Sequence, residues 1–250
     1  MANNALARIE SALRERKLDR TLTSALAPLD RSDAAAFIPF GVEAIDGVLR
    51  GGLPRGQVSE IAGSPSSGRT TLLLQLLSAA TRGGEITALV DTCDRLDVAS
   101  AAAAAIDLDR LLWIRGESFD SLHSLRAIKA LTLVLQAGGF AVVAIDLADV
   151  HPRVLKSLPF TTWLRLQRIV EGSDTACLLV TPEPLARSAG GLTVMCTGRT
   201  TWSAAQTQSG ATQQTRHTHR VTGLETEIRV VSPRRRVDGA VRFTAVANDY

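Results

Sequence analysis

The chain has 250 residues, a formal net charge of +3, 45% hydrophobic residues and 21% charged residues. These values are ordinary for a globular protein that buries one substantial core. The three cysteines are an odd number without metal-ligand spacing, which argues against a disulfide framework and indicates a reducing, cytoplasmic setting. We expect no secretory signal, because the N-terminus is charged throughout, and no membrane span, because no apolar stretch reaches roughly 20 residues.

The first 36 residues differ from the rest of the chain in composition and in the pattern of their apolar residues. Apolar residues in the segment 4–16 recur at helical spacings, which predicts a short amphipathic helix. These residues are Ala5, Leu6, Ile9, Ala12 and Leu13. The segment 22–36 is rich in Ala, Ser and Asp, which indicates a linker. We therefore expect residues 1–36 to form an N-terminal helix and linker, and residues 37–250 to form the core domain with its C-terminal strands.

From residue 57 onward, short apolar runs alternate with longer helical windows. The runs predict buried strands at 57–62, 86–91, 111–114, 141–146 and 176–181. The windows predict helices at 69–81, 97–106, 118–137 and 152–171. After residue 191 we expect antiparallel strands at 192–202 and 225–231, with a polar loop between them. The alternation predicts an α/β fold with a mostly parallel sheet, helices on both faces and antiparallel C-terminal strands.

The strongest motif lies between the first predicted core strand and the first predicted core helix. It consists of Gly63, Ser64, Pro65, Ser66, Ser67, Gly68, Arg69, Thr70 and Thr71. The glycines let backbone N–H groups approach phosphate oxygens, the helix N-terminus adds a positive dipole, and the hydroxyl after the basic residue binds magnesium. The motif predicts a phosphate-binding loop for ATP, with Thr70 as a magnesium ligand. An ordinary turn that leads into a helix is the alternative.

The basic residue of this loop is Arg69, where the phosphate-loop pattern has lysine. Arginine keeps the positive charge, but its planar fork is bulkier than an ammonium group that must reach between the terminal phosphates. We expect nucleotide binding to survive this change more readily than hydrolysis.

Several aspartates follow the predicted strands. Asp146 ends an apolar run, and a carboxylate at the end of a strand beside the phosphate-loop strand is a usual magnesium partner, so we predict that role. A cap of the next turn is the alternative. Asp91 also ends a predicted strand, and Asp94 and Asp97 follow it. One of these could approach the site, although Asp97 is explained more simply as the N-cap of the next helix.

Basic residues gather in the C-terminal part of the chain. The candidates for nucleic-acid contact are Arg216, Arg220, Arg234, Arg235 and Arg236. Arginines of this kind bind the phosphate backbone of single-stranded DNA with salt-dependent, sequence-independent affinity. Solvated turns are the alternative, because turn residues flank the triple arginine. His217 and His219 lack partners at metal-ligand spacing, so we expect no zinc site.

The segment 40–61, with its Gly-Gly-Leu-Pro turn at 51–54, resembles the entry to the core of bacterial RecA and its relatives. The segments 66–72 and 91–97 extend the similarity, which continues more weakly through residues 190–199. The predicted N-terminal helix also resembles the helix that RecA packs on a neighbouring subunit. The resemblance implies a RecA-like P-loop domain and a homo-oligomer.

Three features depart from that family's pattern. Family members place a glutamate, which activates the attacking water, where this chain has Cys93. A thiol is mostly protonated at neutral pH and is a poor base. The family's glutamine that senses the terminal phosphate is replaced by Pro182 or Glu183. The two DNA-contacting loops, after the predicted strands 141–146 and 176–181, look much shortened.

This combination resembles a diverged RecA paralogue, similar to the ImuA-type accessory proteins of bacterial mutagenic repair. The resemblance implies a regulatory or accessory factor in DNA repair, recombination and the SOS response to DNA damage, with weak or no ATP hydrolysis. Its implied partners are single-stranded DNA, a RecA-type filament or DNA polymerase accessory proteins. One alternative is an active DNA-dependent ATPase or recombinase in which Asp94 replaces the missing carboxylate. Another is a KaiC-like signalling ATPase that needs no DNA.

Overall fold

A computed structural model describes residues 36–116, 121–186, 191–203, 221–231 and 240–246, with the side chains of residues 121–123 excepted. The chain divides into the units Met1–Asp33 and Ala34–Tyr250, and every described residue belongs to the second unit. The predicted N-terminal helix and nearly all of the predicted linker lie outside the described residues. Within the described ranges, no helix has the length and apolar character needed to span a bilayer.

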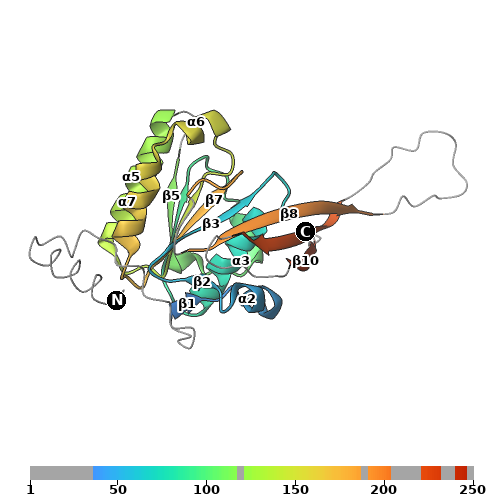
Figure 1. The fold of residues 1–250 in the computed structure, drawn as a ribbon. Coiled ribbons are helices and arrows are strands. Elements are labelled where there is room, and N and C mark those ends of the chain that lie inside the picture. Colours follow the sequence, from blue (N-terminus) through green and yellow to red (C-terminus); the bar gives the residue numbers. More distant parts are fainter. Residues whose placement is uncertain (1–35, 117–120, 187–190, 204–220, 232–239, 247–250) are drawn as a thin grey trace, which may run out of the picture. The chain divides into compact units, whose positions relative to one another are not determined.

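The described residues form a central sheet of eight strands in the order β10-β9-β8-β3-β7-β6-β4-β5 (Figure 1). The strands are β3 (Val58–Gly63), β4 (Thr87–Asp91), β5 (Leu111–Arg115), β6 (Val142–Asp146), β7 (Ala176–Thr181), β8 (Thr193–Trp202), β9 (Val221–Val230) and β10 (Ala240–Val246). The strands from β5 to β8 pair in parallel, whereas β8, β9 and β10 pair antiparallel. The predicted mostly parallel sheet with an antiparallel extension is therefore confirmed.

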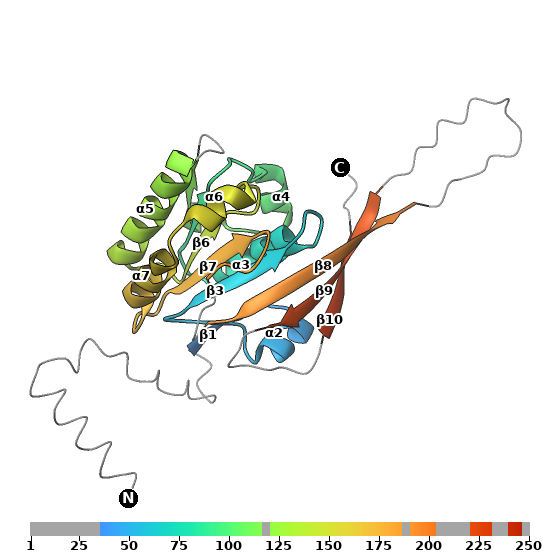
Figure 2. The same cartoon turned by 45° about the horizontal axis from the view of Figure 1, so that its top comes forward.

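Helices cover both faces of the parallel part of the sheet (Figure 2). They are α2 (Glu43–Leu49), α3 (Arg69–Arg82), α4 (Val98–Ala103), α5 (Ser121–Ala137), α6 (Pro152–Ser157) and α7 (Phe160–Val170), with a 3-10 turn, η2, at Leu108–Arg110. Successive residues of a strand point to opposite faces. Leu178 and Val180 of β7 belong to a core cluster that includes residues of α2, α3 and α4, whereas Cys177 and Leu179 belong to one that includes residues of α5, α6 and α7. Burial on both faces explains the uninterrupted apolar runs.

The structure corrects one predicted helix. Residues 152–171 form two helices, because the chain breaks at Leu158 and Pro159. Leu158 has ψ 127°, an extended conformation, and Pro159 is the N-cap of α7. The proline ring disfavours a helical conformation for the preceding residue, so a continuous helix could not pass through this point.

Other elements were not anticipated from the sequence. The small antiparallel pair β1 (Phe37–Ile38) and β2 (Leu53–Pro54) brackets α2, and β10 adds an edge strand to the extension. The strand predicted at 225–231 begins earlier, at Val221, and the helix predicted at 97–106 is shorter. The strands β1 and β2 have two residues each, which is too few for a strand periodicity to be recognised in the sequence.

Candidate functional site

The candidate phosphate loop connects the end of β3 to the start of α3. Ser66 and Gly68 have positive φ angles of 59° and 91°, and the Ser67 N–H donates to the Ser64 carbonyl at 3.1 Å. At the start of α3, the Leu72 N–H donates to the Gly68 carbonyl at 2.9 Å, and no described side chain caps this end of the helix. The N–H groups that open α3 therefore lack side-chain acceptors, and such a helix N-terminus suits an anion.

The Arg69 side chain is folded back under the loop, and the residue is only 5% exposed. Its guanidinium donates to the carbonyl of Gly63, the first residue of the loop, and at 3.2 Å to the carbonyl of Ala148 in the segment after β6. It also lies 3.5 Å from Asp149 Oδ1, while Asp149 Oδ2 lies 3.3 Å from Arg95 Nε. Arg69 thus joins the phosphate loop to the segment after β6.

The antiparallel extension packs directly on the phosphate loop. A methyl group added at Gly198 of β8 would come within 3.0 Å of the Ser66 carbonyl oxygen, and one added at Gly68 would come within 3.0 Å of the Thr226 hydroxyl on β9. Real Cβ atoms do not approach other atoms this closely, so only glycine allows this packing. The buried hydroxyls of Ser67 and Thr226 have no hydrogen-bond partner among the described residues. β8 and β9 therefore form one wall of the loop.

Asp146 ends β6, as the sequence predicted, and its Oδ1 accepts the Ala148 N–H at 2.9 Å. Its strand is not beside the phosphate-loop strand, however, because β7 lies between β3 and β6. The expected adjacency was wrong, since crossover connections set strand order. Burial raises the pKa of Asp146 to about 6; the charges of Asp91 and Asp149 raise it too, and the Ala148 N–H and Arg69 oppose the rise. Asp146 is thus mostly ionised at neutral pH.

Thr70 lies in the first turn of α3 and is exposed. Across the described ranges, no group of three or more His, Cys, Asp or Glu side chains could hold a metal ion. The oxygen donors of Thr70 and Asp146 would therefore need phosphate and water as further ligands, which is usual for magnesium.

Cys93 lies in the turn after β4 and is partly buried. Burial raises the pKa of its thiol to about 11, and the negative charges of Asp149, Asp146 and Asp91 act in the same direction. The thiol is therefore protonated at neutral pH and cannot accept a proton from water.

Two of the aspartates near β4 bind backbone N–H groups. The carboxylate of Asp91, 1% exposed, accepts the N–H groups of Arg95 and Leu96 at 2.9 and 2.8 Å and thereby shapes the turn that follows β4. Asp97 accepts the Ser100 N–H at 2.8 Å and caps α4, which confirms the simpler explanation of this residue.

Asp94 forms a two-point ion pair with Arg115 of β5, with both oxygen–nitrogen distances at 2.7 Å. Hydrogen bonding to Arg115 lowers the pKa of Asp94. The Arg115 guanidinium also lies 4.7 Å from the centroid of the Trp113 ring. The strand β5 is the sheet edge, separated from β3 by β4, β6 and β7. The catalytic role of Asp94 stays a prediction, with its carboxylate held by Arg115.

The segment after β7 is anchored to Glu60, a completely buried residue of β3. The Glu60 carboxylate accepts the Leu185 N–H at 2.6 Å, the Ala186 N–H at 3.4 Å and the Thr181 hydroxyl at 3.2 Å. Burial raises the pKa of Glu60 above its usual value, and these hydrogen bonds offset only part of the rise. The segment after β7, which would hold a phosphate sensor, is thus hydrogen-bonded to the phosphate-loop strand β3.

Glu183, one of the two residues at the position of the family's phosphate-sensing glutamine, forms an ion pair with a lysine. Glu183 Oε1 lies 3.0 Å from Lys156 Nζ of α6, and both side chains are about half exposed or more. Of the segment 182–192 between β7 and β8, residues 187–190 lie outside the described residues. The described part therefore places Glu183 in a surface ion pair.

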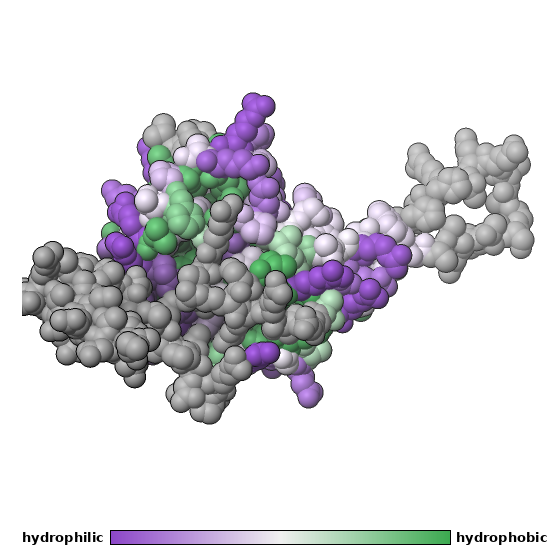
Figure 3. Space-filling model, viewed as in Figure 1, coloured by the Kyte–Doolittle hydropathy of each residue, from purple (hydrophilic) through white to green (hydrophobic). Residues whose placement is uncertain are grey.

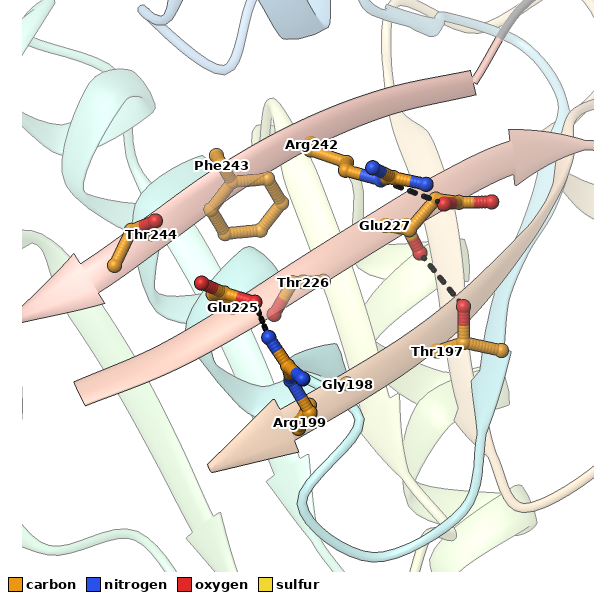
Figure 4. Close-up of a pocket in the computed structure, with 9 residues that line it drawn as sticks. All are labelled: Thr197, Gly198, Arg199, Glu225, Thr226, Glu227, Arg242, Phe243 and Thr244. Atoms are coloured by element: carbon orange, nitrogen blue, oxygen red, sulfur yellow. Dashed lines mark hydrogen bonds and ion pairs between the residues drawn. The ribbon is translucent and has the colours of Figure 1, made fainter. Parts of the chain in front are cut away.

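The five arginines predicted to contact nucleic acid, at positions 216, 220 and 234–236, lie outside the described residues. Hydrophilic residues gather along the antiparallel extension of β8, β9 and β10 (Figure 3). Its three strands line an open hollow of about 700 Å³ (Figure 4). In this hollow Arg199 lies 2.9 Å from Glu225, and Arg242 lies 2.9 Å from Glu227. Glu227 also pairs with Arg229, so the described charged residues of the three strands are three arginines and two glutamates, with a net charge of only +1.

Sequence reasoning missed Asp149, Gly198 and Thr226. Gly198 carried a recognisable signal, because a glycine inside a strand pattern marks a close backbone approach. Asp149 was only one more acidic residue near Asp146, and Thr226 was an ordinary residue of a predicted strand. Their proximity to the phosphate loop arises from the fold.

Comparison of the sequence with those of known proteins assigns the chain to a family. The sequence model of the family described as RecA N-terminal domain matches residues 8–154, more than half of the chain. Protein RecA of Acidothermus cellulolyticus is 36% identical over 152 residues, which are 60% of this chain and 41% of that protein. Protein RecA of Nostoc punctiforme is 37% identical over 117 residues, 46% of this chain and 31% of that protein. The chain thus spans about two fifths or less of these relatives, and it belongs to the RecA N-terminal domain family.

Proposed function

We propose that this protein binds ATP with magnesium at the phosphate loop and acts as a regulatory or accessory factor in DNA repair, recombination or damage-induced mutagenesis, with weak or no ATP hydrolysis. Family membership supports the nucleotide and the repair setting. The observation that carries the regulatory part is the contact of the Arg69 guanidinium with two backbone carbonyls and Asp149.

The residues of the loop fit a polyphosphate. The N-terminus of α3 has no side-chain cap among the described residues, and the buried Ser67 hydroxyl lacks a partner there. The N–H groups of residues 68–71 would hold phosphate oxygens, and the Thr70 hydroxyl and Asp146 carboxylate would hold magnesium and its water. When bound, magnesium neutralises charge on the terminal phosphates.

Two residues weaken hydrolysis in different ways. Phosphoryl transfer to water needs a positioned nucleophile and a cation between the terminal phosphates. Arg69 must break its contacts with the Gly63 and Ala148 carbonyls before its guanidinium can approach phosphate. Cys93 retains its proton at neutral pH and does not activate water. Turnover should therefore be low even where nucleotide binds.

The proposed partners are single-stranded DNA, a RecA-type filament or DNA polymerase accessory proteins, together with further copies of this chain. The relatives aligned over part of their length are named Protein RecA, which supports partners of this kind. An accessory role of the ImuA type accounts best for a RecA-like domain whose Arg69 and Cys93 depart from the hydrolytic pattern.

Calorimetry with MgATP and a turnover assay, each with and without single-stranded DNA, test the proposal. We expect binding, with turnover far below roughly 1 per second, the low end of common enzyme rates. Thr70→Ala should weaken binding, whereas Ser157→Ala, which removes an exposed hydroxyl from α6, should not. No heat with the wild type at millimolar nucleotide rejects the proposed site. Turnover at or above roughly 1 per second favours an active ATPase instead.

The DNA contact has its own test. Replacing Arg234, Arg235 and Arg236 together by alanine should reduce the salt dependence of single-stranded DNA binding by a slope of roughly 2, at about 0.7 per phosphate contact. The control replaces three exposed arginines of α6 and α7, at positions 153, 165 and 168. An unchanged slope in the first variant would assign these arginines to a solvated turn.

A further inference from the structure

Asp149 contacts two arginines that come from different parts of the chain. Its Oδ1 lies 3.5 Å from Arg69 of the phosphate loop, and its Oδ2 lies 3.3 Å from Arg95 in the turn after β4. The two ion pairs differ in burial. The Arg69 side chain is 6% exposed, whereas those of Arg95 and Asp149 are 58% and 44% exposed. Asp149 is therefore a partly exposed counter-charge for a buried guanidinium.

A buried cation is stable only where other groups replace its water. The carbonyls of Gly63 and Ala148 supply hydrogen bonds to Arg69 but no net charge. Asp146 attracts Arg69 electrostatically, but its Oδ1 accepts the Ala148 N–H. Asp149 is the carboxylate in ion-pair contact with the guanidinium, so it contributes directly to holding Arg69 in the folded-back position.

We propose that Asp149 is a positioning residue that holds Arg69 back from the nucleotide phosphates and thereby lowers the affinity of the loop for ATP. The inference rests on the proposed function. A guanidinium has a rigid planar fork, so it cannot keep its contacts with Gly63, Ala148 and Asp149 while it extends toward phosphate. Phosphate oxygens must compete with Asp149 for the same cation. We call this ion pair between Arg69 and Asp149 the latch, because it keeps the guanidinium away from the nucleotide phosphates.

Asp149→Asn removes the charge and keeps the shape of the side chain. The dissociation constant for MgATP, measured by calorimetry, should fall about two- to fivefold, the range expected for losing an ion pair with a half-exposed carboxylate. Asp149→Glu should stay near the wild-type value. Asp109→Asn is the matched control, because Asp109 is exposed in η2 just before β5 and the same unit of charge is removed. It should leave the affinity unchanged.

A second pair of variants asks whether Asp149 acts through Arg69. In an Arg69→Gln background the effect of Asp149→Asn on affinity should disappear, because there is no cation to hold. An equal gain in both backgrounds would mean that Asp149 merely repels phosphate, and it would overturn the latch. Wild-type binding with no gain in Asp149→Asn would also overturn the latch while leaving the proposed function intact.

Unfolding in urea without nucleotide gives an independent measurement. Asp149→Asn should lower the unfolding midpoint of the wild type more than that of the Arg69→Gln variant, since the ion pair with Arg69 is present only in the former and the ion pair with Arg95 is present in both. Equal shifts in both backgrounds count against the latch. If no variant binds MgATP, both the proposed function and the latch fail.

Discussion

Replacing Glu60 by alanine should destabilise the contact between the phosphate-loop strand and the segment after β7. Glu60 is 0% exposed and accepts hydrogen bonds from Thr181, Leu185 and Ala186 at 3.2, 2.6 and 3.4 Å. Each buried donor left without an acceptor costs about 1–3 kcal/mol, and the cavity adds to the loss. Because burying a carboxyl group itself costs free energy, removing it offsets part of this loss of stability. We expect the free energy of unfolding to fall by about 2–4 kcal/mol.

Glu60→Gln separates the hydrogen bonds from the charge. Burial raises the pKa of Glu60 above its usual value of 4.5, so the folded protein holds the proton more tightly than the unfolded chain does. The stability contributed by this proton is fully present below about pH 4.5 and is lost as the pH rises through the folded pKa. Glutamine keeps an acceptor oxygen and does not titrate. The stability of Glu60→Gln relative to wild type should therefore increase as the pH rises above about 4.5.

Urea unfolding followed by tryptophan fluorescence measures both effects. Trp163 is 4% exposed on α7, and Gln167 of the same helix accepts the Val58 N–H of β3 at 2.9 Å, so this signal reports on the relevant packing. Glu43→Ala, at an exposed position in the first turn of α2, is the control. The reasoning is refuted if Glu60→Ala costs no more than Glu43→Ala, or if the pH profiles of Glu60→Gln and wild type run parallel.

Two further predictions concern the loop itself. Gly198→Ala should lower the free energy of unfolding by about 1–3 kcal/mol and weaken MgATP binding, because the methyl group would press on the Ser66 carbonyl. Gly47→Ala in α2, where an added methyl meets nothing within 4 Å, should be neutral or stabilising by roughly 0.5–1 kcal/mol in urea unfolding, and equal losses would contradict the close packing. Arg69→Lys combined with Cys93→Glu should raise ATP turnover well beyond the two single changes together, because the groups act as a unit; merely additive gains in a phosphate-release assay would argue against that coupling.

Local chemistry made several elements predictable from the sequence. A strand buried on both faces must be apolar along its length, so the runs that end at Asp91, Asp146 and Thr181 indicated β4, β6 and β7. The phosphate loop was recognisable because glycines, hydroxyls and a basic residue act at neighbouring positions. The break at Pro159 was equally local, and the helix pattern on either side obscured it.

The sequence by itself determined the α/β class, the position of the phosphate loop and the unusual Arg69. The tertiary structure decided where the guanidinium of that arginine goes. Its partners Ala148 and Asp149 are 79 and 80 positions away along the chain, and crossover connections bring them to the loop. The same connections place β7 between β3 and β6. Spacing along a sequence predicts contacts within one element, whereas contacts between elements depend on the order in which strands join the sheet.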